Sequence, residues 1–340
     1  MLTLLHTSDW RLGRPFARFA PEAAPRLDAA RLTAVENVLA LAAEVDAAAV
    51  VCVGDLFDSP HPAPALRQAV LERLGALKWK DRPVFLVPGD RDPALEGSVW
   101  TDADFRAALP AFVHVVTEPR TVRVRDELTL HLFPATTRVG VREVTATPEG
   151  EGPQVGVVHR ARLLSREALA AAGLDAWCLG GEPAQGFAWD DRALVHSGTP
   201  EPMDFAPGEG RVALLRFGAK GKLLVEPRES AVLRWEEVMV GSLASLRQLG
   251  QRKDLGSRVL RVVVNARVAL SEHAAFQQEL DDLEEDEALV MELDTRQLSL
   301  EVRGLETGDG PAALALAGKR LAERDEPAAR RALAMLAGEG

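Results

Sequence analysis

Apolar residues in the first ninety positions follow two alternating patterns. Continuous apolar runs, typical of buried strands, occur in LTLLHTSD, AAAVVCVGD and PVFLVPGD. Between the runs, apolar residues recur at helical spacing and predict two helices with buried faces: Leu32, Val35, Val38, Leu39 and Ala42, then Leu66, Val70, Leu71, Leu74 and Leu77. This alternation predicts parallel strands joined by crossover helices.

The pattern changes beyond Val113 to short apolar segments separated by turns that contain Pro and Gly. We expect these segments to form a second sheet packed on the first: TVRVRDELTLHLF, VGVVH, AWCLGG, ALVHSG and RVALLRF. From about Ala231, strand and helix patterns alternate again, which predicts a small α+β domain. Helical spacing in the tail, with a break near Asp325–Pro327, predicts two short C-terminal helices.

The composition is that of an ordinary soluble protein and limits its interactions. Of the 340 residues, 47% are hydrophobic and 27% are charged, and no apolar run has the length of a membrane helix. A cytoplasmic location is therefore the default expectation. The net charge of −11 argues against a general electrostatic attraction to nucleic acid, so any DNA contact must be a local patch. Cys52 and Cys178 lie in apolar runs and are expected to be buried without a disulfide.

Three aspartates directly follow predicted strands. Asp9, Asp55 and Asp90 occupy this position, and Gly54 and Gly89 immediately precede two of them. Because ligand sites in open α/β sheets gather at the carboxyl ends of the strands, the three side chains should converge. Converging carboxylates repel one another unless a cation or an arginine lies between them, so the pattern predicts a charged functional site.

The chain resembles the calcineurin-like metallophosphoesterases, and among them the SbcD-type nuclease subunit of DNA repair complexes. The resemblance rests on LHTSDWRLGR and GDLFDSPHPAP, with weaker similarity in HSGTPEPMDF and LRWEEVMV. It implies a four-layer α/β/β/α sandwich over residues 1–228, a small α+β cap domain over 229–305 and a helical partner-binding segment over 306–340. It also implies two metal ions, usually manganese, that together clamp a phosphodiester.

Several family positions are intact in this chain. By the resemblance, Asp9 matches the first ligand, Asp55 the bridging ligand and His159 a later single histidine ligand. Asp58 and Asp92 match residues with structural roles in the second and third motifs.

Other family positions have changed. Arg11 replaces the first histidine, Asp90 replaces an asparagine, and Arg91 replaces the catalytic histidine. Gly181 and Pro183 occupy the positions of the last two histidines, and neither has a side chain that binds metal. These losses imply that nuclease activity is absent or strongly reduced.

The ligand count separates the two implied metal sites. One site would keep Asp9 and Asp55 but lose both histidines, so Asp9 is vestigial there and Arg11 is expected to replace the metal by pairing with Asp9 and Asp55. The other would keep Asp55, Asp90 and His159, which can hold one Mn or Mg ion with water completing the shell. A centre without any metal remains the alternative.

The resemblance implies a divergent SbcD-like subunit that binds DNA and an SbcC-like, SMC-type ATPase and forms a homodimer. Arg14 and Arg18 are candidates for contacts with DNA phosphates. Two alternatives stay open: an active single-metal, Mn-dependent DNA exonuclease or endonuclease, and a phosphoesterase for nucleotides or small phosphodiesters. Whether the protein is an enzyme is left undecided by the sequence.

Overall fold

The chain divides into two compact units, Met1–Leu233 and Arg234–Gly340. The computed structural model describes residues 1–76, 82–139, 141, 143–148, 150–159, 164–182, 184–189, 193–206, 208–269, 272–285, 290–301 and 332. The predicted boundary after residue 228 falls inside a strand, β12 (Leu223–Glu229). The predicted C-terminal helices, and the segment 306–340 apart from Ala332, lie outside the described residues.

The first unit contains two six-stranded sheets. The first sheet has the order β12-β11-β1-β2-β3-β4. Its strands, besides β12, are β1 (Leu2–Thr7), β2 (Ala49–Val53), β3 (Val84–Val87), β4 (Val113–Val115) and β11 (Arg211–Phe217). Strands β1 to β4 are parallel. The hydrophobic pattern predicted β1 to β3 and the two helices that connect them, α1 (Ala24–Glu44) and α2 (Pro64–Ala76). A short helix, α3 (Ala103–Ala108), lies between β3 and β4 in the chain.

One strand was assigned to the wrong sheet. The segment RVALLRF forms β11, which pairs antiparallel with β1 in the first sheet, with Leu4 opposite Leu215. It was expected in the second sheet. Side chains on both faces of β11 are buried, so its apolar run marks a central strand without indicating which sheet it joins.

The second sheet has the order β5-β6-β7-β8-β10-β9. Its strands are β5 (Arg120–Val124), β6 (Leu128–Phe133), β7 (Gln154–His159), β8 (Ala176–Gly180), β9 (Gly186–Trp189) and β10 (Ala193–His196). Strands β6, β7, β8 and β10 are parallel to one another, whereas β5 and β9 run antiparallel at the two edges. The helix α4 (Arg166–Ala171) precedes β8.

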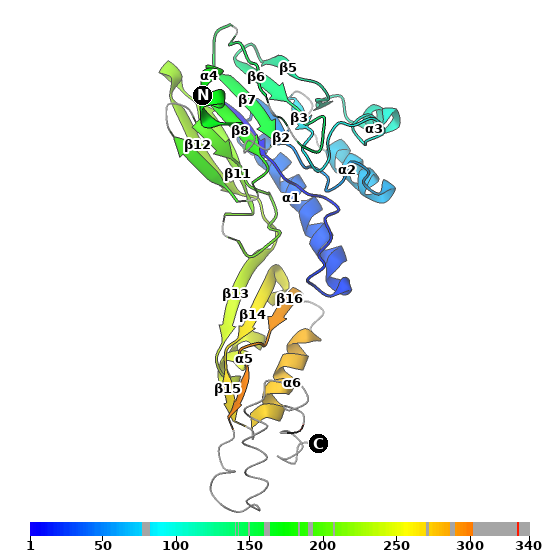
Figure 1. Cartoon of the computed structure of the whole chain (residues 1–340), viewed down its shortest axis with the longest axis vertical. Helices are drawn as coiled ribbons and strands as arrows, with labels where there is room; N and C mark the ends of the chain where they lie inside the picture. Colours follow the sequence, from blue (N-terminus) through cyan, green and yellow to red (C-terminus); the bar gives the residue numbers. More distant parts are fainter. Residues whose placement is uncertain are drawn as a thin grey trace, which may run out of the picture. The chain divides into compact units, whose positions relative to one another are not determined.

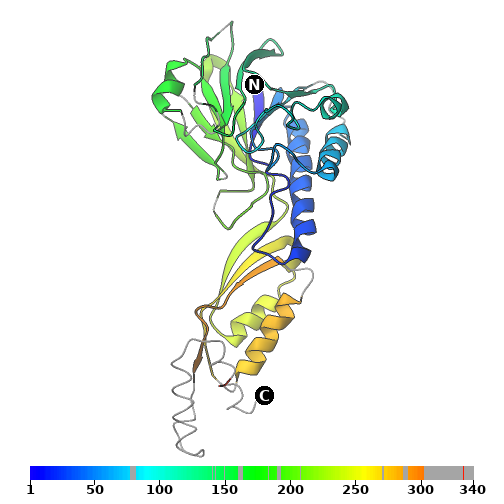
Figure 2. The same ribbon diagram turned by 45° about the vertical axis from the view of Figure 1, so that its right-hand side comes forward.

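Alternate residues of the strands supply separate apolar cores. Leu5 and Val50 face α1 and α2, which cover the outer face of the first sheet (Figure 1 and Figure 2). Leu4 and Val51 instead join a second core with residues of β6, β7 and β8. A third core packs Trp177 of β8 against residues near α4. Burial of each Leu or Val side chain stabilises the folded state by about 1.5–3 kcal/mol. These cores hold together the mixed α/β fold that the sequence predicted.

The second unit is a smaller α/β structure. A parallel sheet has the order β13-β14-β16 and a separate parallel pair is formed by β15 and β17. The bounds are β13 (Arg234–Val240), α5 (Leu243–Gly250), β14 (Arg258–Val264), β15 (Arg267–Ala269), α6 (His273–Glu284), β16 (Val290–Asp294) and β17 (Ser299–Glu301). Apolar residues of both helices and the sheet form one core.

Three short 3-10 helices complete the secondary structure of the described residues: η1 (Pro21–Ala23), η3 (Ala219–Gly221) and η4 (Leu255–Ser257). Cys52 and Cys178 are buried and free, as predicted. Among the described residues, no helix combines the length and apolar character that a membrane span requires.

Candidate metal centre

The loops after β1 and β2 are held side by side at the carboxyl ends of these strands. The backbone N–H of Asp9 donates to the Gly54 carbonyl at 3.0 Å, and that of Arg11 donates to the Asp55 carbonyl at 2.8 Å. Asp9 and Asp55 both adopt a positive φ, 53° and 51°, so the chain turns sharply at each one. The predicted convergence of the strand-end aspartates therefore takes place for these two residues.

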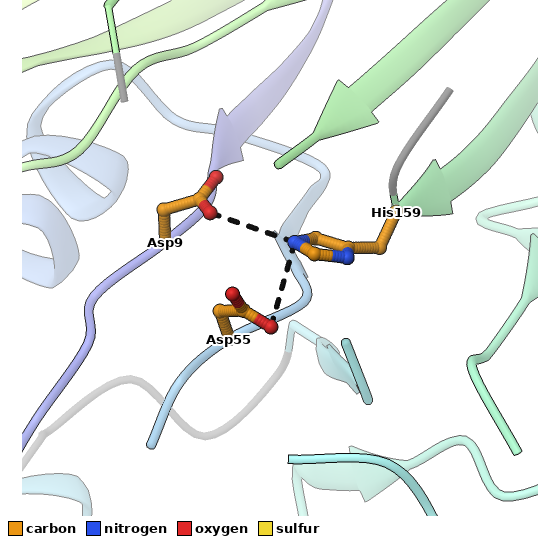
Figure 3. A group of neighbouring side chains, drawn as sticks. All are labelled: Asp9, Asp55 and His159. Atoms are coloured by element: carbon orange, nitrogen blue, oxygen red, sulfur yellow. Dashed lines mark hydrogen bonds and ion pairs between the residues drawn. The ribbon is translucent and has the colours of Figure 1, made fainter. Parts of the chain in front are cut away.

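His159, the last residue of β7, approaches both aspartates from the second sheet (Figure 3). Its Nε2 lies 3.5 Å from Oδ1 of Asp9 and 3.5 Å from Oδ1 of Asp55. One ligand atom from each of the three residues falls within 4.8 Å of the others, and all three side chains are buried. This group could hold a metal ion.

Asp90 lies at the opposite nitrogen of the same imidazole ring. Its carboxylate Oδ1 is 3.3 Å from Nδ1 of His159, and its backbone N–H is also 3.3 Å from that atom. The sequence predicted a metal set of Asp55, Asp90 and His159. The structure instead brings Asp9 to the Nε2 side with Asp55, and it places the Asp90 carboxylate beside Nδ1.

The charges of the three residues are strongly linked. Burial lowers the pKa of His159, but the nearby Asp55, Asp9 and Asp90 carboxylates outweigh it and raise this pKa to about 9. Burial raises the pKa of Asp55 to about 6, although His159 opposes the rise. For Asp9, hydrogen bonding and the charge of His159 outweigh burial and lower the pKa. Without metal, the His159 imidazolium thus serves as the counter-ion of the two aspartates, and a bound cation would displace its proton.

Backbone amides fix the orientation of both carboxylates. The N–H of Gly181 donates to Oδ2 of Asp9 at 2.9 Å, and the N–H of Arg91 donates to Oδ1 of Asp55 at 2.9 Å. Outer contacts of this kind orient ligands and strengthen metal binding. Gly181 occupies a position where the resemblance implied a histidine, so its contribution comes from the main chain.

Asp92 stabilises the loops beneath the centre. Its carboxylate accepts hydrogen bonds from the backbone N–H groups of Asp55, Phe57 and Gly89, at 3.1, 3.0 and 2.9 Å. The side chain is completely buried, and burial raises its pKa well above the ordinary value. Its contacts are those of a residue that holds the backbone in place.

Close packing around His159 requires two glycines that the sequence did not mark as neighbours of this ring. A Cβ at Gly54 would lie 2.1 Å from Cδ2 of His159, and one at Gly180 would lie 2.6 Å from the same atom and 2.0 Å from the Val53 carbonyl oxygen. Gly54 also has a φ of 76°. The only sequence signal is a glycine at the end of each apolar run.

Arg11 provides a positive charge on the outer side of Asp55. Its Nη1 lies 3.4 Å from Oδ2 of Asp55, and its Nε donates to Oδ1 of Asp58 at 2.6 Å. The sequence predicted Asp9 and Asp55 as its partners. Among the described residues, the acidic partners of Arg11 are Asp55 and Asp58, because the turn after Asp9 directs the guanidinium toward the second loop.

The remaining predicted residues lie outside this cluster. The side chain of Arg91 is exposed, so its observed role is that of its backbone N–H. Nη1 of Arg14 lies 3.4 Å from Sδ of Met203. Arg18 donates two hydrogen bonds to the Asp204 carboxylate, at 2.7 and 2.9 Å, which partly compensates its charge. Pro183 lies outside the described residues.

Comparisons with known proteins give structural similarity without a family assignment. No protein-family model and no curated protein matches the sequence. A crystal structure of TT1561 from Thermus thermophilus is 14% identical over 67% of this chain and 99% of that chain, with a TM-score of 0.40. GAP50, named as the anchor in the inner membrane complex of Plasmodium, is 12% identical over 67% of this chain and 84% of its own, with a TM-score of 0.39.

Proposed function

We propose that the first unit binds one divalent cation, Mn or Mg, through Asp9, Asp55 and His159. The observation that carries this proposal is the buried group of two carboxylates and one imidazole whose ligand atoms lie within 4.8 Å of one another. Oxygen and nitrogen donors of this kind suit these cations, with water completing the shell. The proposed set contains Asp9 in place of the sequence-predicted Asp90.

The surroundings fit one cation better than two. Arg11 already pairs with Oδ2 of Asp55. This is the carboxylate oxygen through which a bridging aspartate would bind a second metal. Its charge would repel a further cation placed there. A single bound cation supplies two kinds of chemistry: it lowers the pKa of a bound water, and it neutralises charge on a phosphoryl group.

The biological role we propose is that of a divergent metallophosphoesterase-like, SbcD-type subunit with reduced nuclease activity. Support comes from the resemblance of its motifs and from the exposed arginine, Arg91, at the position implied for a catalytic histidine. In this role the protein would bind DNA and an SbcC-like ATPase, and would act as a dimer in their assembly.

Metal binding is tested by elemental analysis and by calorimetric titration of the purified, EDTA-treated protein with manganese. We expect one ion per chain in the wild type and none in Asp55→Asn. Asp104→Asn, which changes an exposed aspartate of α3, should bind manganese as the wild type does. Absence of manganese from the wild type at saturating concentration would refute the metal centre.

Nuclease activity is tested on the same proteins with single- and double-stranded DNA. The proposed reduced-activity subunit should bind DNA without appreciable cleavage in manganese. Cleavage that Asp55→Asn abolishes would instead favour an active single-metal nuclease. Hydrolysis of small phosphodiesters without DNA binding would favour the third reading, a phosphoesterase for small substrates.

A further inference from the structure

A cleft of about 600 Å³ lies at the end of the first sheet opposite to the metal centre. Its walls include the amino ends of β3 and β4, together with β5 and the turn that follows it. The metal centre forms at the carboxyl ends of β1, β2 and β7, so the two sites do not share residues. The volume lies within the range of about 300–1,000 Å³ that is usual for small-molecule sites.

The charged residues that line this cleft are all basic. Four arginines contribute to it, and no Asp or Glu does, although the whole chain carries a net charge of −11. These arginines are Arg82, Arg120, Arg123 and Arg125. Such a concentration of one sign of charge favours an anionic ligand.

Two of the four arginines form ion pairs with aspartates, and two do not. Arg82 pairs with Asp46, and Arg123 lies 3.6 Å from the exposed carboxylate of Asp126. Within the described part of the chain, Arg120 and Arg125 form no ion pair. Both side chains are exposed at the cleft, and their guanidinium groups are available for a phosphate.

Arg125 occupies an unfavourable backbone position. It and Asp126 both have positive φ, 51° and 53°, in the turn that closes β5 on β6. Turns of this kind favour Gly, Asn or Asp, and an arginine there is uncommon. Strained positions often accompany function, and this turn places a cationic side chain at the cleft.

The cleft also offers aromatic surface beside its charges. Phe112 and His114 line it, and the ring of His114 packs on Phe85 with centroids 5.5 Å apart. Val122 and Val124 add apolar surface from β5. Aromatic rings provide stacking surfaces for nucleobases, whereas an inorganic anion alone would not use them.

We propose that this cleft binds an organic phosphate of the nucleotide class, with the phosphate on Arg120 and Arg125 and the base against Phe112 and His114. The ligand is either a free nucleotide or the phosphorylated end of a nucleic-acid strand, which share this chemistry. The proposal does not depend on metal binding at Asp9, Asp55 and His159.

The test is calorimetric titration of the full chain with adenosine monophosphate in EDTA, which excludes metal-dependent binding. We expect the double variant Arg120→Gln/Arg125→Gln to lose about tenfold or more in affinity, because two charge-assisted contacts are removed. Arg106→Gln, an exposed arginine of α3 outside the cleft, is the matched control and should bind as the wild type does. Thermal melting of each variant checks that it is folded.

Further ligands separate the two parts of the proposed contact. Adenosine and inorganic phosphate should each bind more weakly than adenosine monophosphate. A short oligonucleotide with a terminal phosphate that displaces the nucleotide would identify strand ends as a source, and failure to displace it would identify the free nucleotide. The proposal is overturned if the wild type does not bind millimolar nucleotide, if the double variant binds equally well, or if adenosine binds as tightly as its monophosphate.

Discussion

The two ends of the first sheet carry opposite charges in opposite environments. At the carboxyl ends of the strands, Asp9 and Asp55 are each only 2% exposed and face the fully buried His159. At the amino ends, Arg120 and Arg125 are exposed and line an open cleft. The first sheet therefore has a buried acidic site at the carboxyl ends of β1 and β2 and a solvated basic cleft at the amino ends of β3 and β4.

The difference between the two sites shows that burial determines whether a charged side chain needs a partner of opposite charge. Buried carboxylates must have a counter-ion or a proton, because removing a charge from water costs several kcal/mol. His159 and Arg11 supply the counter-ions at the carboxyl end. Exposed arginines need no partner, because water solvates them, and they remain available to a ligand. We therefore expect substitutions of the buried carboxylates to affect stability and metal binding, and substitutions of the exposed Arg120 and Arg125 to affect ligand affinity more than stability.

The largest expected effect comes from Gly54→Ala at the carboxyl end. The new Cβ would overlap His159 and would force alanine into a positive φ. We expect a loss of roughly 3–5 kcal/mol in the free energy of unfolding, from overpacking and backbone strain together. Chemical denaturation measures it. In α2, Gly75→Ala meets no neighbouring atom and should stabilise the protein slightly; equal effects of the two substitutions would contradict the packing argument.

Next in size is the contrast between Asp9→Asn and Asp90→Asn, which separates the two possible metal sets. Asp9→Asn removes a proposed ligand and should abolish measurable manganese binding. Asp90→Asn alters the carboxylate beside Nδ1 of His159 without removing a proposed ligand, and should cost about ten- to hundredfold in affinity, as loss of a supporting group does. Calorimetric titration with manganese measures both. The reverse order would favour the set predicted from the sequence.

A smaller and opposite effect is expected for Arg11→Met. Removing the cation beside Asp55 should raise manganese affinity by about tenfold, because a neighbouring positive charge no longer opposes the metal. The metal-free protein should become less stable, since Asp58 loses its partner. Arg11→Lys keeps the charge and should not raise the affinity. Titration with manganese and thermal melting are carried out on both variants. Weaker manganese binding by Arg11→Met than by the wild type would contradict this account.

The smallest effects concern pH, and they should have opposite signs at the two ends. Glu201, in the loop after β10, has its pKa raised to about 7 by burial, although the Val232 and Leu233 N–H groups oppose the rise. The folded state therefore binds more protons than the unfolded state between pH 4.5 and about 7, and the contribution of Glu201 to stability falls as pH rises through this range. At the amino end, burial and then Arg120 lower the pKa of His114, so its contribution rises with pH up to 6.5.

Thermal melting at a series of pH values can separate these contributions. Relative to the wild type, Glu201→Gln should gain melting temperature as pH rises from 4.5 to about 7. His114→Gln should lose it as pH rises toward 6.5. Since only the slope is compared, any constant effect of either substitution on packing cancels. If the melting-temperature difference from the wild type changed with pH in the same direction for both variants, the predicted opposite pH dependence of Glu201 and His114 would be wrong.

Much of the fold could be predicted because local patterns specify it. Apolar runs and helical spacing indicated β1 to β3, α1 and α2, and the strand-end position of Asp9 and Asp55 indicated a site. The sheet to which β11 belongs could not be predicted, because a central strand is apolar on both faces in either sheet. The pairing of Arg11 with Asp58 was also missed, since residue type gives the charge of a group but not its direction.

The sequence by itself determined the mixed α/β class, the buried state of both cysteines and the meeting of two aspartates at the carboxyl ends of their strands. These three features can be predicted from hydrophobic periodicity or from the position of a polar residue directly after an apolar run. Only the tertiary structure decided that Asp9 shares Nε2 of His159 with Asp55, and that Arg120 and Arg125 line one cleft with Arg82. These contacts join distant segments through the packing of two sheets, and local pattern carries no information about distances between them.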